Sequence, residues 1–600
     1  MKIPKPVIYE VDYTNDDLSN LKTKERIKSK KDQKLIFNYP TVYIVNDEVN
    51  SSKYSVYVGE TTNINRRTEE HMTNDSKNRK DWREMFESDR SKMFIIGHEH
   101  FNKSLTLDVE NRLMQYLSSV ESVVSVNNRR TNPQNDYYTA EELGPIFSQI
   151  WRKLRKKNKE LFPLERIIRD SAIFKASPFH KLTREQMAAR EDIILKVTEA
   201  LNHDAASNFE NKEQLIIVEG EAGSGKTVLM SSLFYELNQL AKEESDNVVI
   251  RGTSQYLLVN HDQQLKVYEQ IVTKLGILSK QNPDVVSKPT RFINMHSEDK
   301  KADIVIVDEA HLLWTQGKQS YIGKNQLDDL LKRAKVVIAV LDRNQILSRE
   351  QYWDEVEMRN KIHEAADKHK YIYLENQLRI NADKETINWI RGLVDNRTIE
   401  NIPRDSKKYD LRIFDDPETM YTKIQEKAKN EESGISRILA TFDWEYVDKR
   451  KPDNEDYWYV KIGDWKLPWN LQIPQSKEEK RRNRDRAWAE QSQTIGEVGS
   501  TFTIQGFDLN YAGVIIGPSV KYRNGKIVFD KNESKNKKAT QLRGTENGEK
   551  LDVSDFLLKN ELNVLLTRGV NGLYIYAVDE ELREALKKAK KGELFDNLKQ

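Results

Sequence analysis

The chain has 600 residues, enough for several domains, and its 25 Tyr, 18 Phe and 10 Trp exclude a largely disordered protein despite a hydrophobic content of 37%. Charged residues make up 32% of the chain, yet the formal net charge is only +2, so nucleic-acid binding must be argued from local clusters. The chain has no cysteine, which excludes disulfides, thiolate nucleophiles and zinc sites built from cysteine.

Residues 1–38 are expected to form a basic N-terminal arm. Between residues 20 and 35, lysine and arginine outnumber the acidic Glu25 and Asp32, a pattern typical of a solvated helix face and more rarely of a phosphate contact. The N-terminus lacks the apolar core of a signal peptide, and no apolar run approaches the roughly 20 residues of a membrane span. We therefore expect a cytoplasmic protein with no membrane partner.

Residues 39–135 have the pattern of one small domain. Residues 41–45 and 54–59 predict a β-hairpin with a long turn, and residues 60–71 open a helix with Thr61 or Thr62 as its N-cap. A second helix covers residues 107–117. Its Val109, Leu113 and Leu117 share one buried face, and Glu110 lies one position off that face, at its edge.

Five residues of this segment stand in the order of a nuclease motif: Tyr43 after Val42, Tyr57 in Tyr57-Val58-Gly59, Arg67, His71 and Glu110. The segment resembles the GIY-YIG nuclease domain. The resemblance implies that Glu110 binds one divalent metal, Mg²⁺ or Mn²⁺, and that Arg67 stabilises charge on the phosphoryl oxygens. It also implies that Tyr43 and Tyr57 hold or deprotonate the attacking water, with His71 as a second candidate base.

Two features of this segment leave alternatives open. Thr41 stands where the first motif of the family usually has glycine, which affects the geometry of the site more than its chemistry. Either Asn127 or Asn128 could supply the late asparagine of the family. A domain that keeps the fold but does not cut nucleic acid is therefore the alternative to an active nuclease.

The pattern changes after residue 135. Residues 136–176 are expected to form a helical connector. From about residue 177 onward, short aliphatic strands alternate with helices, which predicts an α/β fold of parallel sheets with helices on their faces. These strands are expected at 215–218, 303–307, 336–341, 371–374 and 512–516. Polar stretches at 446–486 and 519–560 are expected to be surface insertions or mobile loops.

A complete G-x4-G-K-[ST] phosphate loop runs from Gly220 to Thr227. The strand at 215–218 precedes it and a helix over 228–237 follows it, which is the context that the motif requires. The loop backbone, with Gly220, Gly223 and Gly225, is expected to cradle the phosphates of a nucleotide. Lys226 would reach the β- and γ-phosphate oxygens, and the Thr227 hydroxyl would ligate Mg²⁺.

The second half of the nucleotide site follows the apolar run at 303–307. Asp308 is expected to hold the Mg²⁺ shell, and Glu309 is expected to polarise the attacking water. We interpret His311 as a hydrogen-bonding residue that couples two lobes rather than as a catalyst. Two such motifs, each behind a strand of buried type, predict binding of ATP with Mg²⁺.

Further blocks resemble helicases of superfamily 1 and stand in the order of that superfamily. The resemblance implies that Gln186 contacts the adenine edge and that Gln345, the last residue of a D-x-x-Q block, senses the γ-phosphate. It also implies that Arg379 and Arg568 act as arginine fingers. Asp508 stands where many relatives have a glutamate that contacts the ribose.

Over about residues 177–585 the chain is similar to the schlafen group 3-like DNA/RNA helicase domain. The blocks that carry this resemblance lie at 257–261, 308–311, 438–441, 467–470 and 505–511. The resemblance implies two RecA-like lobes, residues 177–375 and 376–600, with ATP in the cleft between them.

We therefore expect an ATP-dependent nucleic-acid motor coupled to a metal-dependent endonuclease, with nucleic acid as its partner and DNA favoured over RNA. By analogy alone, bacterial anti-phage defence is its expected setting. The alternative is an ATP-switched protein that binds nucleic acid or a partner and carries an inactive nuclease domain. An NTP-dependent enzyme of small-molecule metabolism is disfavoured, because the D-x-x-Q and arginine blocks have no role in it. No oligomeric state follows from the sequence.

Overall fold

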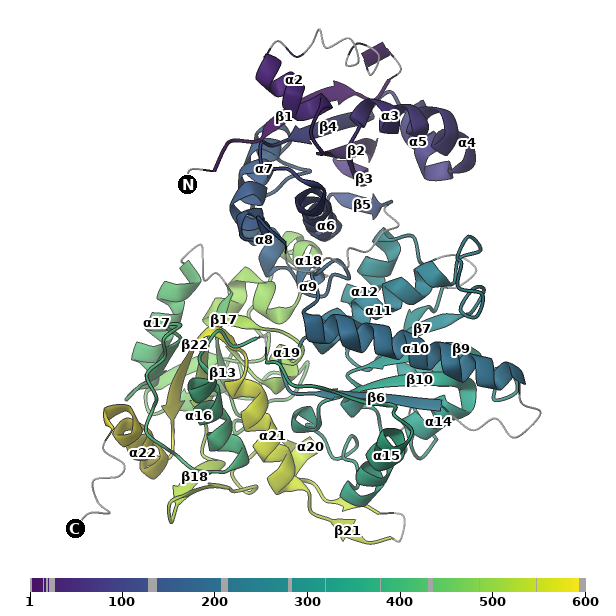
Figure 1. Cartoon of the computed structure of the whole chain (residues 1–600). Helices are drawn as coiled ribbons and strands as arrows, with labels where there is room; N and C mark the ends of the chain where they lie inside the picture. Colours follow the sequence, from purple (N-terminus) through teal and green to yellow (C-terminus); the bar gives the residue numbers. More distant parts are fainter. Residues whose placement is uncertain are drawn as a thin grey trace. The chain divides into compact units, whose positions relative to one another are not determined.

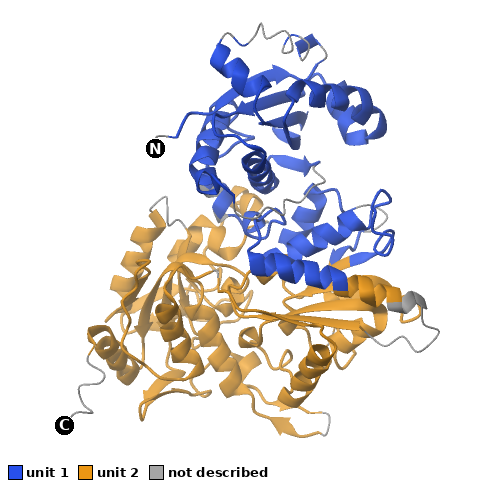
Figure 2. Ribbon diagram, in the orientation of Figure 1, with its two compact units in different colours: residues 1–195, 227–255, 266–286 blue, residues 196–226, 256–265, 287–600 orange. Residues whose placement is uncertain are grey.

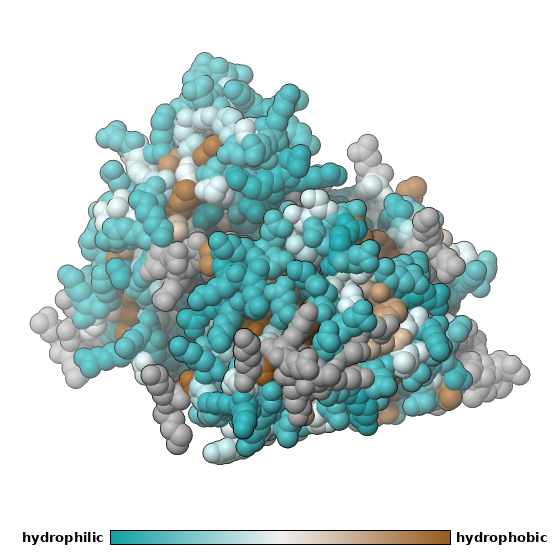
Figure 3. Space-filling model, turned by 90° about the horizontal axis from the view of Figure 1, so that it is seen from above, coloured by the Kyte–Doolittle hydropathy of each residue, from teal (hydrophilic) through white to brown (hydrophobic). Residues whose placement is uncertain are grey.

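The computed structural model describes residues 3–14, 16–17, 20, 27, 29–127, 137–206, 214–278, 283–318, 320–377, 379–429, 435–484, 486–545 and 548–592. The chain forms two compact units (Figure 2). Unit 1 comprises residues 1–195, 227–255 and 266–286, and unit 2 comprises residues 196–226, 256–265 and 287–600. Within the described part of the chain, no helix is long and apolar enough to cross a membrane. The face drawn in Figure 3 is mostly hydrophilic, and its apolar side chains form small separate groups.

Unit 1 begins with a five-stranded sheet of order β1-β4-β2-β3-β5 (Figure 1). The strands are β1 (Val7–Asp12), β4 (Lys92–Gly97), β2 (Thr41–Asn50), β3 (Lys53–Thr61) and β5 (Val123–Val126). The first four are antiparallel to their neighbours, and β5 joins β3 in parallel. Residues 7–12 of the expected basic arm are thus the edge strand of this sheet. Residues 21–26 and 28 of that arm lie outside the described residues.

Helices cover both faces of this sheet, and the central strand β2 is therefore buried on both sides. Val42 and Ile44 face a core shared with α6 (Lys103–Ser119) and α7 (Leu143–Lys157), the latter from the expected connector. Tyr43 and Val45 face a second core with α2 (Lys30–Phe37), α3 (Ile64–Glu70) and α5 (Lys80–Glu87). The N-cap of α3 is Asn63, which accepts from Arg66 N, so the expectation of Thr61 or Thr62 was wrong.

Unit 2 is built on two parallel sheets, which confirms the predicted α/β class. The first has the order β11-β6-β10-β9-β7-β8. Its strands are β11 (Tyr371–Leu374), β6 (Gln214–Gly220), β10 (Ala334–Leu341), β9 (Ala302–Asp308), β7 (Gln255–Val259) and β8 (Val286–Ser287). The second has the order β12-β22-β17-β13-β16. Its strands are β12 (Asp410–Ile413), β22 (Gly569–Ala577), β17 (Leu509–Ile516), β13 (Ser436–Ala440) and β16 (Val498–Gly499).

Helices from residue 184 onward connect these strands. They include α10 (Arg184–Ala206), α11 (Lys226–Leu240), α12 (Asp262–Lys274), α13 (Pro289–Met295), α14 (Gln326–Arg333), α15 (Glu355–Asp367), α16 (Lys384–Asp395), α17 (Pro417–Lys429), α21 (Ser554–Leu566) and α22 (Glu580–Lys591). Because parallel strands point the same way, β6, β9 and β10 bring their carboxyl ends to one edge of the first sheet. The phosphate loop, Asp308 and Asp342 all follow these ends.

The two polar stretches are folded rather than mobile loops. The first contains the hairpin of β14 (Tyr459–Ile462) and β15 (Trp465–Pro468), and its Val460 and Trp469 are buried in the core of the second sheet. The second contains the hairpin of β18 (Val520–Arg523) and β19 (Lys526–Phe529) and helix α20 (Lys537–Thr540). Its Ala539 and Val553 are buried in the core of the first sheet. A few apolar residues in a polar stretch are enough to anchor each insertion.

Candidate active sites

Two glycines of the phosphate loop have a left-handed backbone. The loop leaves β6 at Gly220, and α11 begins at Lys226. Gly223 has a φ of +91° and Gly225 a φ of +79°. A Cβ on Gly223 would lie 2.5 Å from the Cβ of Arg379. This position therefore requires glycine both for its φ and for the close approach of an expected arginine finger.

The ammonium of Lys226 is buried and has three oxygen partners. Nζ donates to the carbonyl oxygens of Gly220 (2.6 Å) and Glu221 (2.8 Å) and lies 3.3 Å from Asp342 Oδ2. Burial by itself would raise the pKa of Asp342, but the charge of Lys226, the electrostatic effect of the neighbouring His311 and a hydrogen bond from Gln345 hold that pKa below its usual value. Asp342 is therefore an anion that fixes Lys226 against its own loop.

A chain of polar contacts continues from Asp342 to the second lobe. Gln345 Nε2 donates to Asp342 Oδ2 (2.6 Å), and Gln345 Oε1 accepts from Arg568 Nη2 (2.8 Å). Arg568 is fully buried, and its Nε donates to the carbonyl of Val564 (3.1 Å). Burial lowers the pKa of Arg568 to about 10, which leaves it protonated at pH 7. Lys226, Asp342, Gln345 and Arg568 thus form one connected series.

Both expected arginine fingers face a single carboxylate. Arg379 Nε lies 2.5 Å from Asp508 Oδ1, and Arg568 Nη1 lies 4.0 Å from the same oxygen. Asp508 follows the left-handed turn at Gly506, just before β17. The residue expected to contact a ribose is therefore an ion-pair partner of Arg379 in this structure.

Asp308 and Glu309 lie at the carboxyl end of β9. Asp308 is buried and accepts hydrogen bonds from Gln264 Nε2 (2.7 Å) and from Glu309 N (3.0 Å). Glu309 has a φ of 52°, a costly conformation for a residue with a Cβ and one that clusters at functional sites. His311 Nε2 lies 3.2 Å from Glu309 Oε2. Burial lowers the pKa of His311, so its imidazole is neutral at pH 7.

The remaining expected nucleotide ligands, Gln186 and Thr227, belong to unit 1. Gln186 lies in the first turn of α10, where its Oε1 accepts from Thr183 N (3.0 Å) and its backbone N donates to Thr183 Oγ1 (3.2 Å). This reciprocal pair is a capping box, and it holds the buried amide in one orientation. Thr227 is the second residue of α11.

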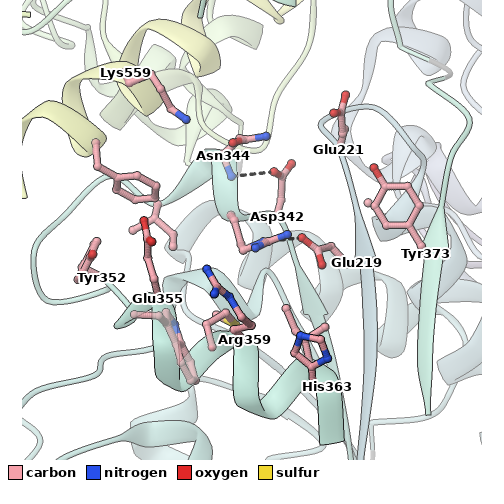
Figure 4. A pocket seen from close by; sticks show the side chains of 17 residues that line it. Glu219, Glu221, Asp342, Asn344, Tyr352, Glu355, Arg359, His363, Tyr373 and Lys559 are labelled. Carbon is pink, nitrogen blue, oxygen red and sulfur yellow. Dashed lines mark hydrogen bonds and ion pairs between the residues drawn. The ribbon is translucent and has the colours of Figure 1, made fainter. Parts of the chain in front are cut away.

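A cavity of 610 Å³ lies beside the phosphate loop (Figure 4). Gly220, Glu221 and Asp342 line it, together with residues of α15 and with Phe556 and Lys559 of α21. Its described lining does not include Lys226 or the two arginines. We therefore regard it as a neighbour of the nucleotide site rather than as the site itself.

The small sheet of unit 1 brings the two expected tyrosines together. Tyr43 of β2 pairs with Gly59 of β3 in the strand register. A Cβ on Gly59 would lie 2.4 Å from the Tyr43 hydroxyl, so only glycine lets this ring cross the neighbouring strand. The rings of Tyr43 and Tyr57 are stacked, with centroids 6.1 Å apart. The Tyr-x-Gly pattern thus has a steric reason.

His71 connects Tyr43 to an aspartate that the sequence analysis did not single out. The Tyr43 hydroxyl lies 2.7 Å from His71 Nε2, and His71 Nδ1 lies 2.6 Å from Asp75 Oδ2. A carboxylate can only accept, so Nδ1 carries the proton and Nε2 accepts from Tyr43. His71–Asp75 is a π-helical turn, a rare element that is frequent at functional sites. Burial, and next the charge of Arg67, lower the pKa of His71 to about 4.

Trp82 and Arg67 complete this cluster. The Trp82 ring stacks on His71 with centroids 3.7 Å apart and planes 19° apart, and both side chains are buried. Arg67 Nη1 donates to Glu70 Oε2 (3.1 Å) and lies 3.8 Å from Asp75 Oδ2. The guanidinium therefore stays next to the Tyr43–His71–Asp75 series while remaining about one-third exposed.

Glu110 is buried in α6, with 7% of the residue exposed. The expectation that it lies at the edge of a single buried face was wrong, because α6 is buried on nearly all sides. Burial raises the pKa of Tyr57, and the charge of Glu110 raises it further, so the carboxylate acts on the tyrosine pair. Of the two late asparagines, Asn127 donates to Ser55 Oγ (3.0 Å), and Asn128 lies outside the described residues.

Comparison with known proteins identifies two domains of the chain. Residues 213–579 match the family described as Schlafen group 3, DNA/RNA helicase domain. The chain belongs to this family. Residues 39–121 match the GIY-YIG catalytic domain. The chain thus joins a GIY-YIG domain to a Schlafen group 3 helicase domain in that order, as predicted.

Two further comparisons concern single proteins. A Saccharomyces cerevisiae protein with the name Uncharacterized protein YPL245W is 34% identical over 469 residues, which cover 74% of this chain and 98% of that protein. A solved structure described as "The structure of PRRSV helicase" aligns with 65% of this chain and 56% of that chain, at 10% identity and a TM-score of 0.26.

The residues of the two domains fit the expected ligands to different degrees. In the helicase domain the glycine loop, its lysine and a buried aspartate provide the donors and the carboxylate that a nucleotide with Mg²⁺ needs. In the GIY-YIG domain, Glu110 is the one carboxylate expected to bind metal. Among the described residues, no three His, Asp or Glu side chains gather into a metal site. A single carboxylate fits a hard cation that keeps most of its positions for water and phosphate.

Several residues of these sites were missed by sequence reasoning. Asp75 lies four positions after His71 and Gln264 lies in the first turn of α12, and nothing local marks either of them. Asn560 and Asn563 of α21 donate to the carbonyls of Arg343 (2.9 Å) and Asn344 (3.0 Å) in the D-x-x-Q turn. Their spacing of three on a helix that leads to Arg568 is a signal that could have identified them.

Proposed function

We propose that the chain is an ATP-driven nucleic-acid motor coupled to a metal-dependent endonuclease. The observation that carries this proposal is the connected series Lys226, Asp342, Gln345 and Arg568. It joins the expected phosphate-binding lysine to an expected arginine finger of the other lobe, so hydrolysis at one end can change the contact between lobes at the other.

In the proposed hydrolysis, Glu309 polarises a water that attacks the γ-phosphorus while the bond to the β-phosphate oxygen breaks. Lys226 exchanges the carbonyls of Gly220 and Glu221 for phosphate oxygens, and Arg379 and Arg568 neutralise the charge that develops. Mg²⁺ held through Thr227 and Asp308 supplies further neutralisation of the phosphates when bound.

In the proposed cleavage, a water attacks the phosphorus of the backbone and the bond to one sugar oxygen breaks, and this oxygen takes a proton from solvent. Tyr43 takes a proton from the water as its own proton passes to His71 Nε2, which is unprotonated at pH 7. Asp75 stabilises the imidazolium, and Arg67 stabilises the phosphoryl oxygens. Glu110 would hold the divalent metal, which would act as a Lewis acid. Because one carboxylate occupies few coordination positions, the others would be available to water and phosphate.

The test is to measure ATP turnover and cleavage on matched panels of single- and double-stranded DNA and RNA. Single-stranded nucleic acid should stimulate turnover by the parent protein, and Mg²⁺-dependent cleavage should follow, with DNA preferred. Stimulation without cleavage would favour the alternative, an ATP-switched binding protein. An ATP turnover rate that is the same with and without nucleic acid would contradict the proposed motor activity.

For a bacterial host, we also propose by analogy that the two activities restrict phage DNA. The test is the efficiency of phage plating with the protein, without it, and with Glu110→Ala. Equal plating in all three strains would contradict this role and leave the enzymatic proposal intact.

A further inference from the structure

Helix α6, which carries Glu110, is covered from more than one side. Thirteen of its 17 residues are buried, whereas a helix on one face of a sheet ordinarily keeps a solvated stripe. The buried residues include the polar Asn111, Gln115, Ser118 and Ser119. The nuclease sheet covers one face of α6, so other segments of unit 1 must cover the polar face.

The segment around Phe179 is part of that cover, and α11 packs against it. Asn111, next to Glu110, donates from Nδ2 to the carbonyl of Phe179 (2.8 Å) in a buried contact. The Phe179 ring meets Tyr235 of α11 edge-on, with centroids 5.3 Å apart, and both rings belong to the core that holds α6. Because α11 begins at Lys226, the helix that starts at the phosphate loop also packs in the core of the nuclease helix.

Helix α12 holds the carboxyl end of α6. Lys274, the last residue of α12, is half-buried, and its Nζ donates to the carbonyls of Ser118 (2.9 Å) and Val120 (2.8 Å). Carbonyls at this end of a helix lack partners within the helix, and a cation there also opposes the helix dipole. Burial lowers the pKa of Lys274 to about 8, so the ammonium is still charged at pH 7.

The first turn of α12 belongs to the nucleotide site. Gln264 Nε2 donates to Asp308 Oδ2 (2.7 Å), and Gln264 Oε1 lies 3.7 Å from where a Cβ on Gly506 would stand. Asp308 is the carboxylate expected to hold the Mg²⁺ shell. A metal–nucleotide complex would therefore compete with Gln264 for this oxygen. One helix thus has a bond to Asp308 at one end and, at the other, bonds to the last turn of α6 and to Val120 just after it.

We propose that α11 and α12 transmit the nucleotide state to the nuclease, so that binding of Mg²⁺ with ATP repositions α6 and with it Glu110. The proposal rests on the proposed function and names the regulation of its cleavage site. The hydrogen bond between Gln264 and Asp308 is the contact that differs between the two states, which is what a coupling between sites requires. The hydrogen bonds of Lys274 at the carboxyl end of α6 are the contact through which α12 would act on α6.

Hydrogen exchange of the full-length protein tests this directly. Peptides covering residues 103–119 are compared with and without Mg²⁺ and a non-hydrolysable ATP analogue. The parent should show a nucleotide-dependent change in exchange at α6, and its cleavage rate should change by about fivefold or more. Lys274→Met should lose both responses while its nucleic-acid-stimulated ATP turnover stays within about twofold, a change too small to indicate a lost catalytic contact.

Two further variants separate coupling from a general loss of structure. Lys266→Met changes an exposed lysine of the same helix and should respond like the parent, and Lys274→Arg should retain part of the response because it keeps a donor. Identical exchange at α6 in all nucleotide states of the parent would overturn the coupling. A response in Lys274→Met equal to that of the parent would overturn it as well.

The exchange measurement needs nucleotide binding but no cleavage, so the two proposals can fail separately. Normal ATP turnover and cleavage with no response at α6 would reject the coupling and keep the proposed function. A response at α6 in a protein that never cuts nucleic acid would support the coupling and reject the nuclease activity.

Discussion

Asp508→Asn is the substitution that best distinguishes two roles for one residue. The Asp508 carboxylate lies 2.5 Å from Arg379 Nε and 4.0 Å from Arg568 Nη1. If both arginines are to reach a γ-phosphate, they must leave this carboxylate or share it. The substitution keeps the size of the side chain but removes the competing charge, so we expect tighter nucleotide binding.

The size of the effect follows from the burial of the pair. The side chain of Arg379 is 14% exposed and that of Asp508 is 28% exposed, so the pair is neither a surface contact nor a fully desolvated one. A surface pair contributes about 0–1 kcal/mol and a charged hydrogen bond about 1.5–3 kcal/mol. An intermediate value of about 1–1.5 kcal/mol corresponds to roughly five- to tenfold tighter binding.

The assay is an equilibrium titration with a fluorescent, non-hydrolysable ATP analogue, repeated with its 2′-deoxy form. The control is Asp555→Asn, which breaks an Arg–Asp pair with Arg397 on the surface of the same lobe and should leave affinity unchanged. Weaker binding of ATP together with a lost preference for ribose would refute the competition argument. It would instead support the ribose contact that the family resemblance implies.

The remaining predictions concern turnover, cleavage and stability. Lys226→Ala should abolish ATP hydrolysis, because it removes the ammonium that faces the phosphates. Glu309→Gln should bind ATP but stall turnover, because it removes only the carboxylate that polarises the water. Near-normal turnover by either variant would show that the cleft is misassigned. Glu110→Ala should lose cleavage, measured on long duplexes with Mg²⁺, and retain stimulated ATPase activity, and cutting at the parental rate would contradict the nuclease site. Burial raises the pKa of Glu561 to about 7, so the stability linked to this carboxyl is present below its usual pKa and lost as the pH rises through 7. The melting temperature should therefore be higher at pH 5.5 than at pH 8, because the free energy of unfolding is about 2–3 kcal/mol larger at the lower pH. Glu561→Gln should remove this difference. An equal dependence of stability on pH in parent and variant would contradict the assignment.

The chemistry of the nucleotide site could be predicted because its residues belong to short sequence motifs that directly follow strands. Lys226 follows β6, Asp308 ends β9 and Gln345 follows β10, and each block needs only its own strand and turn to be placed. Their common edge then follows from parallel strands pointing the same way. The α/β class was predicted for the same reason, since the strand rhythm is local.

The partners of these residues could not be predicted, because they depend on tertiary packing. Gln264 and Asp308 are 44 residues apart, and Gln345 and Arg568 are 223 residues apart. Neither pair has a sequence signal that joins its members. The role of β1 was missed for the same reason, since Val7 pairs with Gly97 at the far edge of the small sheet. Polar composition also failed to show the buried anchors, because Trp469 is fully buried within a stretch expected to be a surface insertion or a mobile loop.

The wrong expectation for Glu110 leads to a further point about how the chain is assembled. A nuclease helix that stands alone would keep polar residues such as Asn111 and Gln115 in water, and an amphipathic pattern describes that situation correctly. Here those residues are buried, and Asn111 and the carbonyl of Ser118 have partners in segments beyond residue 176. The face of α6 that looks solvated in the sequence is therefore an interface within unit 1. A polar helix face next to a second domain in the same chain is better interpreted as a docking surface, because each of its buried polar groups then needs a hydrogen-bond partner that the second domain can supply.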